Sequence, residues 1–163
     1  MSKNISLTGI FAALTFVFTA YIFHIPAGTA GYMHIGDTFI YLAASILPLK
    51  FAMISGALGG MLADTLLGAL MWVIPTMIIK PILAICFKKD DKKIVTKRNV
   101  LGSIVAGAVG TFLYMIAGGF IYGFEGAFAI GMITLIQPIG STIFYVLVGS
   151  ALDKINFIER FTV

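Results

Sequence analysis

The chain has 163 residues, of which 60% are apolar and only 11% are charged, and its formal net charge is +4. Soluble domains carry about 25% charged residues, so a water-soluble globule of this size could not bury so much apolar surface. The composition argues against soluble enzymes, nucleic-acid-binding domains and secreted disulfide scaffolds, and its one cysteine allows no internal disulfide. We therefore predict an integral membrane protein in which residues 1–163 form a single domain.

Six apolar segments follow one another along the chain, and the second of them is short. They are too long and too evenly apolar for the strands of a membrane barrel, and backbone groups in lipid must pair within the protein. The sequence therefore predicts an all-α fold, a bundle of six transmembrane helices. Their expected ranges are about residues 5–23, 36–49, 51–69, 71–87, 100–122 and 127–152.

Lysine and arginine residues fall on one side of this predicted bundle, and the opposite loops contain none. Basic residues gather on the cytoplasmic side of membrane proteins, so we expect both termini in the cytoplasm. Within the predicted spans, only Lys80 departs from this pattern. The basic residues on the predicted cytoplasmic side are Lys3, Lys50, Lys88, Lys89, Lys92, Lys93, Lys97, Arg98, Lys154 and Arg160.

The first segment carries small residues at helical spacing. Gly9 and Ala13 form one such stripe, and Thr8 and Ala12 form the stripe beside it. Small side chains allow another helix to approach closely within a membrane. These positions are therefore candidates for contact with a neighbouring helix.

Three ionisable residues lie within or at the edge of predicted spans: Asp37, Asp64 and Lys80. Such residues are costly in a bilayer and need a partner or a function. Asp64 and Lys80 flank the turn of one helical hairpin, and their depths differ by only about 6 Å. We predict that they form a buried ion pair, and two roles stay open for it: locking the hairpin, or also facing a polar ligand.

Residues 24–37 form a glycine-rich connection that includes His24, Tyr32 and His34. The two histidines are not at a helical spacing and have no close cysteine or glutamate, so we expect no metal site. The connection could instead cover an outward-facing pocket. Aromatic and polar side chains that could complete such a pocket occur later in the chain, at Trp72, Tyr114, Tyr122, Glu125 and Gln137.

The sequence lacks the motifs of several catalytic classes. It has no GxxxxGK[ST] phosphate loop, no HExxH pair and no GxSxG nucleophile elbow. We therefore expect no catalytic residues and no cofactor, and any ATP hydrolysis must occur on separate subunits.

Three strings carry a resemblance to a known family: GYMHIGDTFIYLAASILP (residues 31–48), GGMLADTLLG (59–68) and IPTMIIKP (74–81). The chain resembles the S components of energy-coupling-factor (ECF) vitamin transporters, in the ECF-type riboflavin transporter S component family. In that family a glycine–aspartate opens the second helix, an alanine–aspartate lies in the third, and a lysine follows a proline in the fourth. Asp37, Asp64 and Lys80 occupy these positions.

The resemblance implies a subunit of a prokaryotic plasma membrane that captures a B vitamin or precursor from outside. Riboflavin and pyridoxine- or hydroxymethylpyrimidine-like compounds are the candidate substrates. The implied partners are a transmembrane coupling subunit, docked at Gly9, Ala12 and Ala13, and two cytoplasmic ATPases. Two alternatives remain: an ion-coupled secondary carrier and a structural assembly protein. The expected substrate-binding residues are Tyr32, His34, Asp37, Asp64, Trp72, Lys80, Tyr114, Tyr122, Glu125 and Gln137.

Overall fold

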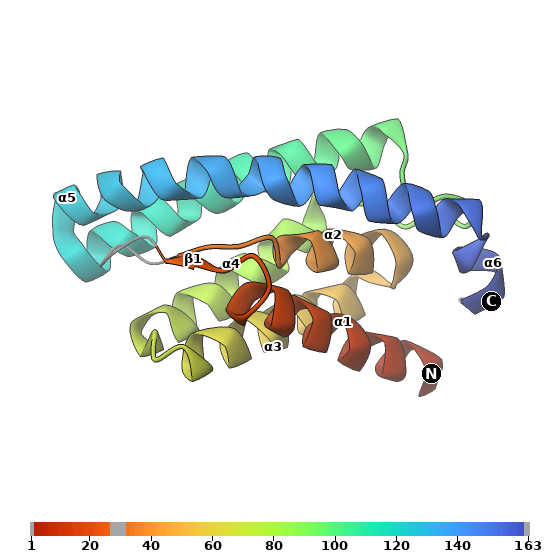
Figure 1. Ribbon diagram of the computed structural model, residues 1–163, viewed down its shortest axis with the longest axis horizontal. Helices are drawn as coiled ribbons and strands as arrows, with labels where there is room; N and C mark the ends of the chain where they lie inside the picture. Colours follow the sequence, from red (N-terminus) through yellow and green to blue (C-terminus); the bar gives the residue numbers. More distant parts are fainter. Residues whose placement is uncertain (1, 27–31, 162–163) are drawn as a thin grey trace.

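A computed structural model describes residues 2–26 and 32–161 (Figure 1). The described chain is mainly helical, with one two-stranded antiparallel pairing in which Ile25 lies opposite Met33. Both termini lie at the same end of the molecule (Figure 1). The elements in order are α1 (Ser2–Ala20), β1 (Ile25–Pro26), β2 (Tyr32–Met33), α2 (Asp37–Ile46), α3 (Leu49–Leu66), η2 (Leu70–Trp72), α4 (Val73–Ile85), α5 (Lys97–Lys154) and α6 (Phe157–Phe161).

The longest element, α5, consists of two arms that run back along each other (Figure 1). Its 58 residues are interrupted at Gly123, whose φ of 78° and ψ of −174° are not helical. Glycine tolerates this conformation because it has no Cβ. The arms pack closely, since a Cβ added at Gly107 would overlap Pro138. The bend therefore joins the segments predicted at 100–122 and 127–152.

Helix α2 is short and lies at the centre of the molecule. All ten of its residues are buried, and it contacts α1, α3, α4 and α5. It ends before Pro48, whose ring disfavours a helical conformation at the preceding residue, and α3 begins directly afterwards. The polar N-terminus of α2, at Asp37, is thus placed inside the bundle.

In the part of the chain that the structure describes, three helices are long and apolar enough to cross a membrane by length and composition: α1, α3 and α5. Two shorter apolar helices cover Asp37–Ile46 and Leu70–Ile85. This is the architecture of an all-α membrane protein. The predicted boundaries differ from the observed ones by several residues: α1 and α3 begin and end earlier than predicted, and α2 and α4 are shorter. Hydropathy marks the apolar part of a segment, whereas a helix begins and ends with its backbone hydrogen bonds.

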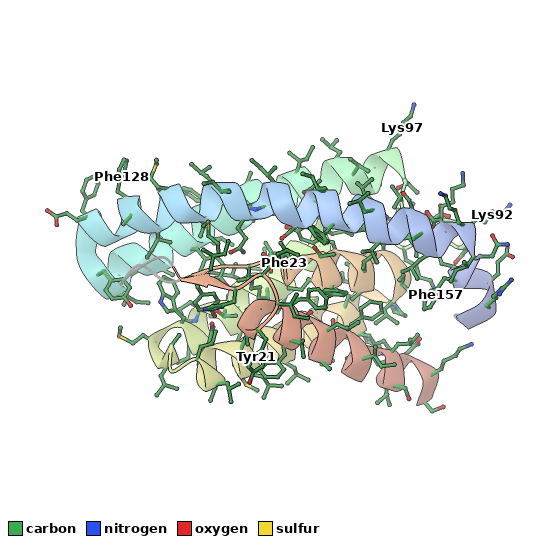
Figure 2. The ribbon with its side chains drawn as sticks, in the orientation of Figure 1. Tyr21, Phe23, Lys92, Lys97, Phe128 and Phe157 are labelled. Atoms are coloured by element: carbon green, nitrogen blue, oxygen red, sulfur yellow. The ribbon has the colours of Figure 1, made fainter. Side chains whose placement is uncertain are left out.

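A polar network ties the basic connection between α4 and α5 to the rest of the molecule. The Asp153 carboxylate accepts hydrogen bonds from the backbone N–H groups of Ile94 (2.7 Å) and Val95 (3.0 Å). The Asn99 side chain accepts from the Lys88 N–H at 3.0 Å and donates to the Lys88 carbonyl at 2.9 Å. These bonds hold the basic segment at the end that carries the termini, where Figure 2 shows Lys92 and Lys97.

The small residues of α1 do not all face the same way. Ala12 is only 6% exposed, and its carbonyl oxygen lies against Gly59 of α3. The prediction that Ala12 docks a partner subunit was therefore wrong, because its face of α1 is already covered by α3. Gly9 and Ala13 lie on the exposed face.

We expect Gly59→Leu to destabilise the protein much more than Gly9→Leu. A Cβ at Gly59 would lie 2.6 Å from the Thr15 Cβ and 2.7 Å from the Ala12 carbonyl oxygen, whereas one at Gly9 meets no atom within 4 Å. Overpacking of this kind costs about 1–3 kcal/mol. Thermal unfolding in detergent measures the difference, and equal melting temperatures for the two variants would contradict this packing of α1 on α3.

Candidate functional site

A cavity that is partly open to solvent lies among α1, α3, α4, α5, η2 and the strand β2. Two of its lining residues, Tyr114 and Ile130, flank the bend of α5 at Gly123. The cavity therefore lies toward the bend and away from the basic segment. The residues that line it are Thr19, Tyr32, His34, Gly60, Asp64, Trp72, Thr76, Lys80, Tyr114, Ile130, Thr134 and Gln137.

Lys80 of α4 lines the cavity and forms a buried ion pair with Asp37 of α2 behind it. The Lys80 ammonium donates to Asp37 Oδ1, and the Gln137 side-chain amide donates to Asp37 Oδ2 at 2.9 Å. Lys80 is 2% exposed and Asp37 is 3% exposed. Asp37 also begins α2, where the helix dipole favours a negative charge. Three chain segments thus converge on one carboxylate.

The prediction that Asp64 pairs with Lys80 was wrong about the partner. Lys80 forms its ion pair with Asp37, and Asp64 accepts a hydrogen bond from the Tyr32 hydroxyl instead. The depths of Asp64 and Lys80 within one helical hairpin do not reveal that α2 packs against α4 and brings Asp37 to Lys80.

One carboxylate oxygen of Asp64 is buried without a hydrogen-bond partner among the described residues. Oδ1 accepts from the Tyr32 hydroxyl, but Oδ2 has no hydrogen-bond partner among the described residues, although Asp64 is only 4% exposed. Buried polar atoms are normally paired in folded proteins. Because the protein encloses Oδ2, it is an unpaired acceptor within the wall of the cavity and does not face the open space.

His34 lies in the connection between β2 and α2 and is buried. Its Nδ1 accepts a hydrogen bond from the Gly36 backbone N–H at 3.0 Å, which places the proton of the neutral ring on Nε2. Burial, and next the nearby Lys80 charge, lowers the pKa of His34 to about 3. His34 is thus a neutral donor at the cavity wall.

Aromatic rings form two rows beside the cavity. Trp72 lies 5.8 Å from Tyr114 and 6.1 Å from Tyr122, measured between ring centroids. Tyr32 lies 5.7 Å from His34 in the second row. Flat apolar faces with polar edges suit a planar aromatic ligand.

Most of the predicted binding residues are brought together. Tyr32, His34, Asp64, Trp72, Lys80, Tyr114 and Gln137 line the cavity, and Asp37 holds two of them in place. Tyr122 contacts Trp72 but does not line the cavity. The prediction of Glu125 as a cavity residue was wrong: it follows the bend at Gly123 and its side chain stays exposed, as an ionised carboxylate favours.

The sequence reasoning missed five lining residues: Thr19, Gly60, Thr76, Ile130 and Thr134. Threonine in a helix often bonds its own preceding turn, as Thr134 does with the Ile130 carbonyl at 2.8 Å, so its presence carried no signal. Gly60 could have been found from the sequence, since Gly56 and Gly60 form a stripe of small residues at helical spacing. In the structure, a Cβ added at Gly60 would lie 2.5 Å from the Thr76 methyl group.

Two further expectations concern the wall of the cavity. The predicted lid, residues 24–37, includes residues 27–31, which lie outside the described part of the chain. In residues 2–26 and 32–161 there is no group of three or more His, Cys, Asp or Glu side chains that could hold a metal ion. The described wall of the site includes aromatic, hydroxyl, amide and charged groups.

Comparison with known proteins identifies the family of the chain. The model of the ECF-type riboflavin transporter S component family matches residues 1–155. A search of curated proteins found no match. The family match covers nearly the whole chain, including every residue that lines the cavity. The chain therefore belongs to the ECF-type riboflavin transporter S component family, the substrate-binding subunits of vitamin transporters.

Proposed function

We propose that this chain is the substrate-capturing membrane subunit of an ECF-type ABC importer. It binds a B vitamin or vitamin precursor, either riboflavin or a pyridoxine- or hydroxymethylpyrimidine-like compound. The observation that carries the proposal is the aromatic cavity above the buried Lys80–Asp37 pair, in a chain of this family. Such a cavity offers ring faces and a few fixed polar groups, as small-molecule sites do.

The proposed orientation places the cavity on the extracellular side of a prokaryotic plasma membrane. The basic connection between α4 and α5 and both termini lie at one end of the molecule, and the positive-inside rule assigns that end to the cytoplasm. The cavity lies toward the bend at Gly123. With each arm of α5 counted as one span, the chain would cross the membrane six times.

The proposed partners are a transmembrane coupling subunit and two cytoplasmic ATPases. The sequence contains no phosphate loop, so in this proposal the ATP that drives uptake is hydrolysed on another chain. Gly9 and Ala13 supply the small exposed side chains of α1 to which a partner helix can dock. ATP hydrolysis would occur on these partners.

Reconstitution in liposomes tests this division of labour. We expect the purified chain to bind vitamin but not to concentrate it under a proton or sodium gradient. Addition of the coupling subunit, the two ATPases and ATP should produce uptake. Accumulation by the chain alone would overturn the proposal and indicate an ion-coupled secondary carrier. Vitamin binding without uptake in either condition would contradict the proposed energy source.

A further inference from the structure

The connection between α4 and α5 concentrates the positive charge of the chain. From Lys88 to Arg98 it carries six basic and two acidic residues, so its formal charge of +4 equals the net charge of the whole chain. The rest of the sequence is neutral overall, with five basic and five acidic residues. We call residues 88–98 the basic connection. All eight of its charged side chains are exposed: Lys88, Lys89, Asp90, Asp91, Lys92, Lys93, Lys97 and Arg98.

The backbone of the basic connection is fixed by the helices against which it packs. The Asp153 carboxylate binds the N–H groups of Ile94 and Val95, and the Tyr145 hydroxyl donates to the Ile94 carbonyl oxygen at 2.8 Å. The Ile94 side chain is fully buried. The basic side chains therefore extend from a backbone that is already ordered, so a ligand that binds them has less chain to immobilise.

The cations of the basic connection have no counter-charge in the described part of the chain. Within residues 2–26 and 32–161, none of the six basic side chains forms an ion pair. The Asp90 carboxylate instead accepts hydrogen bonds from the backbone N–H groups of Lys92 at 2.8 Å and Lys93 at 3.0 Å. Like charges on one ordered surface repel each other, so a bound anion relieves a cost that the folded chain carries.

Arg98 and Lys88 bring the two ends of the connection together. The Asn99 side-chain oxygen accepts from the Lys88 backbone N–H at 3.0 Å and from Arg98 Nη1 at 3.5 Å. Arg98 Nη1 also donates to the Cys86 carbonyl oxygen at 3.1 Å, which fixes the guanidinium at the end of α4. Among the described residues, its Nε and Nη2 groups have no acceptor. They are the two-point donors that a guanidinium uses to bind a phosphate group.

The position of the connection indicates which anion it meets. Helix α4 ends at Ile85 and α5 begins at Lys97, so the connection starts and ends where the proposed spans leave the membrane. Lys92 and Lys97 extend away from the helices at the end that carries both termini (Figure 2). Ile94 is buried and Val95 is half-buried, so the connection exposes no apolar anchor of the kind that protein interfaces use. These features favour lipid headgroups over a protein partner.

We propose that the basic connection binds the phosphate headgroups of anionic phospholipids in the cytoplasmic leaflet, with Arg98 and the neighbouring lysines as the contacts. The inference rests on the orientation proposed above and not on the identity of the vitamin. Each basic residue near an anionic membrane surface raises affinity by about fivefold. This attachment holds the cytoplasmic end of the bundle at the membrane surface.

Competition between two lipids tests the inference on the unmodified full-length chain. The chain is purified in neutral detergent and mixed with equal amounts of phosphatidylglycerol and phosphatidylcholine that carry the same acyl chains. Native mass spectrometry then counts the bound lipids. We expect phosphatidylglycerol to bind at least about tenfold better, and the preference to fall as salt is raised, because the attraction is electrostatic. Equal binding of the two lipids would overturn the inference.

Lys92→Gln combined with Lys97→Gln provides the second arm. The loss of two of the six cations should lower the preference for phosphatidylglycerol at least about fivefold. Lys50→Gln combined with Arg160→Gln is the matched control, because it removes two exposed cations from α3 and α6 and should leave the preference unchanged. A preference that falls as far in the control, or that survives in the first double variant, would contradict the assignment to this connection.

Two further results separate a lipid from other partners. Inorganic phosphate should not displace phosphatidylglycerol, because it lacks the acyl chains that hold the lipid beside the connection; full displacement would indicate a site for soluble anions and overturn the inference. A first double variant that keeps its lipid preference but no longer assembles with the ATPases would make the connection a protein-docking surface, which also overturns it. Neither measurement involves the vitamin, so failure of the inference leaves the proposed function standing.

Discussion

Replacement of Lys80 by methionine is expected to destabilise the folded chain by about 3–5 kcal/mol and to abolish ligand binding. The substitution removes the ammonium group that is paired with Asp37 and leaves that carboxylate buried without a counter-charge. Gln137 still donates to Asp37, but a neutral amide does not offset the lost charge. Unfolding of the purified protein by heat or denaturing detergent measures the effect.

A double-mutant cycle identifies the partner of Lys80. Asp37→Asn together with Lys80→Met should cost less than the sum of the single changes, because neither charge is then left alone. The same cycle with Asp64→Asn in place of Asp37→Asn should show a smaller coupling. Lys50→Met is the control, since Lys50 is exposed and its ammonium group lies 5.1 Å from the centre of the Phe51 ring. Stronger coupling of Lys80 to Asp64 than to Asp37 would contradict the observed pair.

Replacement of Ala13 by tryptophan is expected to abolish vitamin uptake by the assembled transporter while ligand affinity of the isolated chain stays within about twofold. Ala13 is exposed on α1, one turn after Gly9, whose surroundings are open. A large side chain would hold a partner helix away from this stripe. Uptake in reconstituted liposomes and co-purification of the coupling subunit measure the two consequences.

The matched control for Ala13→Trp is Ile104→Trp. Ile104 is 57% exposed on the first arm of α5, so this change adds bulk to a different exposed surface. Uptake should persist in that variant. Equal loss of uptake in both variants would mean that bulk anywhere on the surface is harmful. Full uptake in both variants would contradict the assignment of the α1 stripe as a docking surface.

The sequence predicted the class of the fold well because membrane composition is a strong constraint. A charged fraction of 11% and the absence of water in a bilayer leave few architectures for such a chain. The placement of α2 was harder to foresee. Its ten residues read as one short apolar segment, and only tertiary packing shows that they lie at the centre of the bundle and bring Asp37 to Lys80.

The candidate site was predictable in its chemistry but not in its pairings. Ionisable and aromatic residues stand out against an apolar background, which is why seven of the ten predicted binding residues line the cavity. Hydrogen-bond partners depend on rotation about each helix axis, which hydropathy does not determine. Ala12 and Ala13 illustrate this, because adjacent residues on α1 differ by about 100° in direction and only one is exposed.

Native mass spectrometry of the purified chain tests most directly whether this cavity captures a vitamin. We expect one small molecule of a vitamin or vitamin precursor to copurify with each chain. Occupancy should fall sharply in Trp72→Ala, which removes a ring from the cavity wall at a half-buried position and should leave the fold intact. Two results would contradict the capture of a vitamin in this cavity. One is the absence of any bound small molecule after purification and incubation with the vitamins named above, and the other is undiminished occupancy in folded Trp72→Ala.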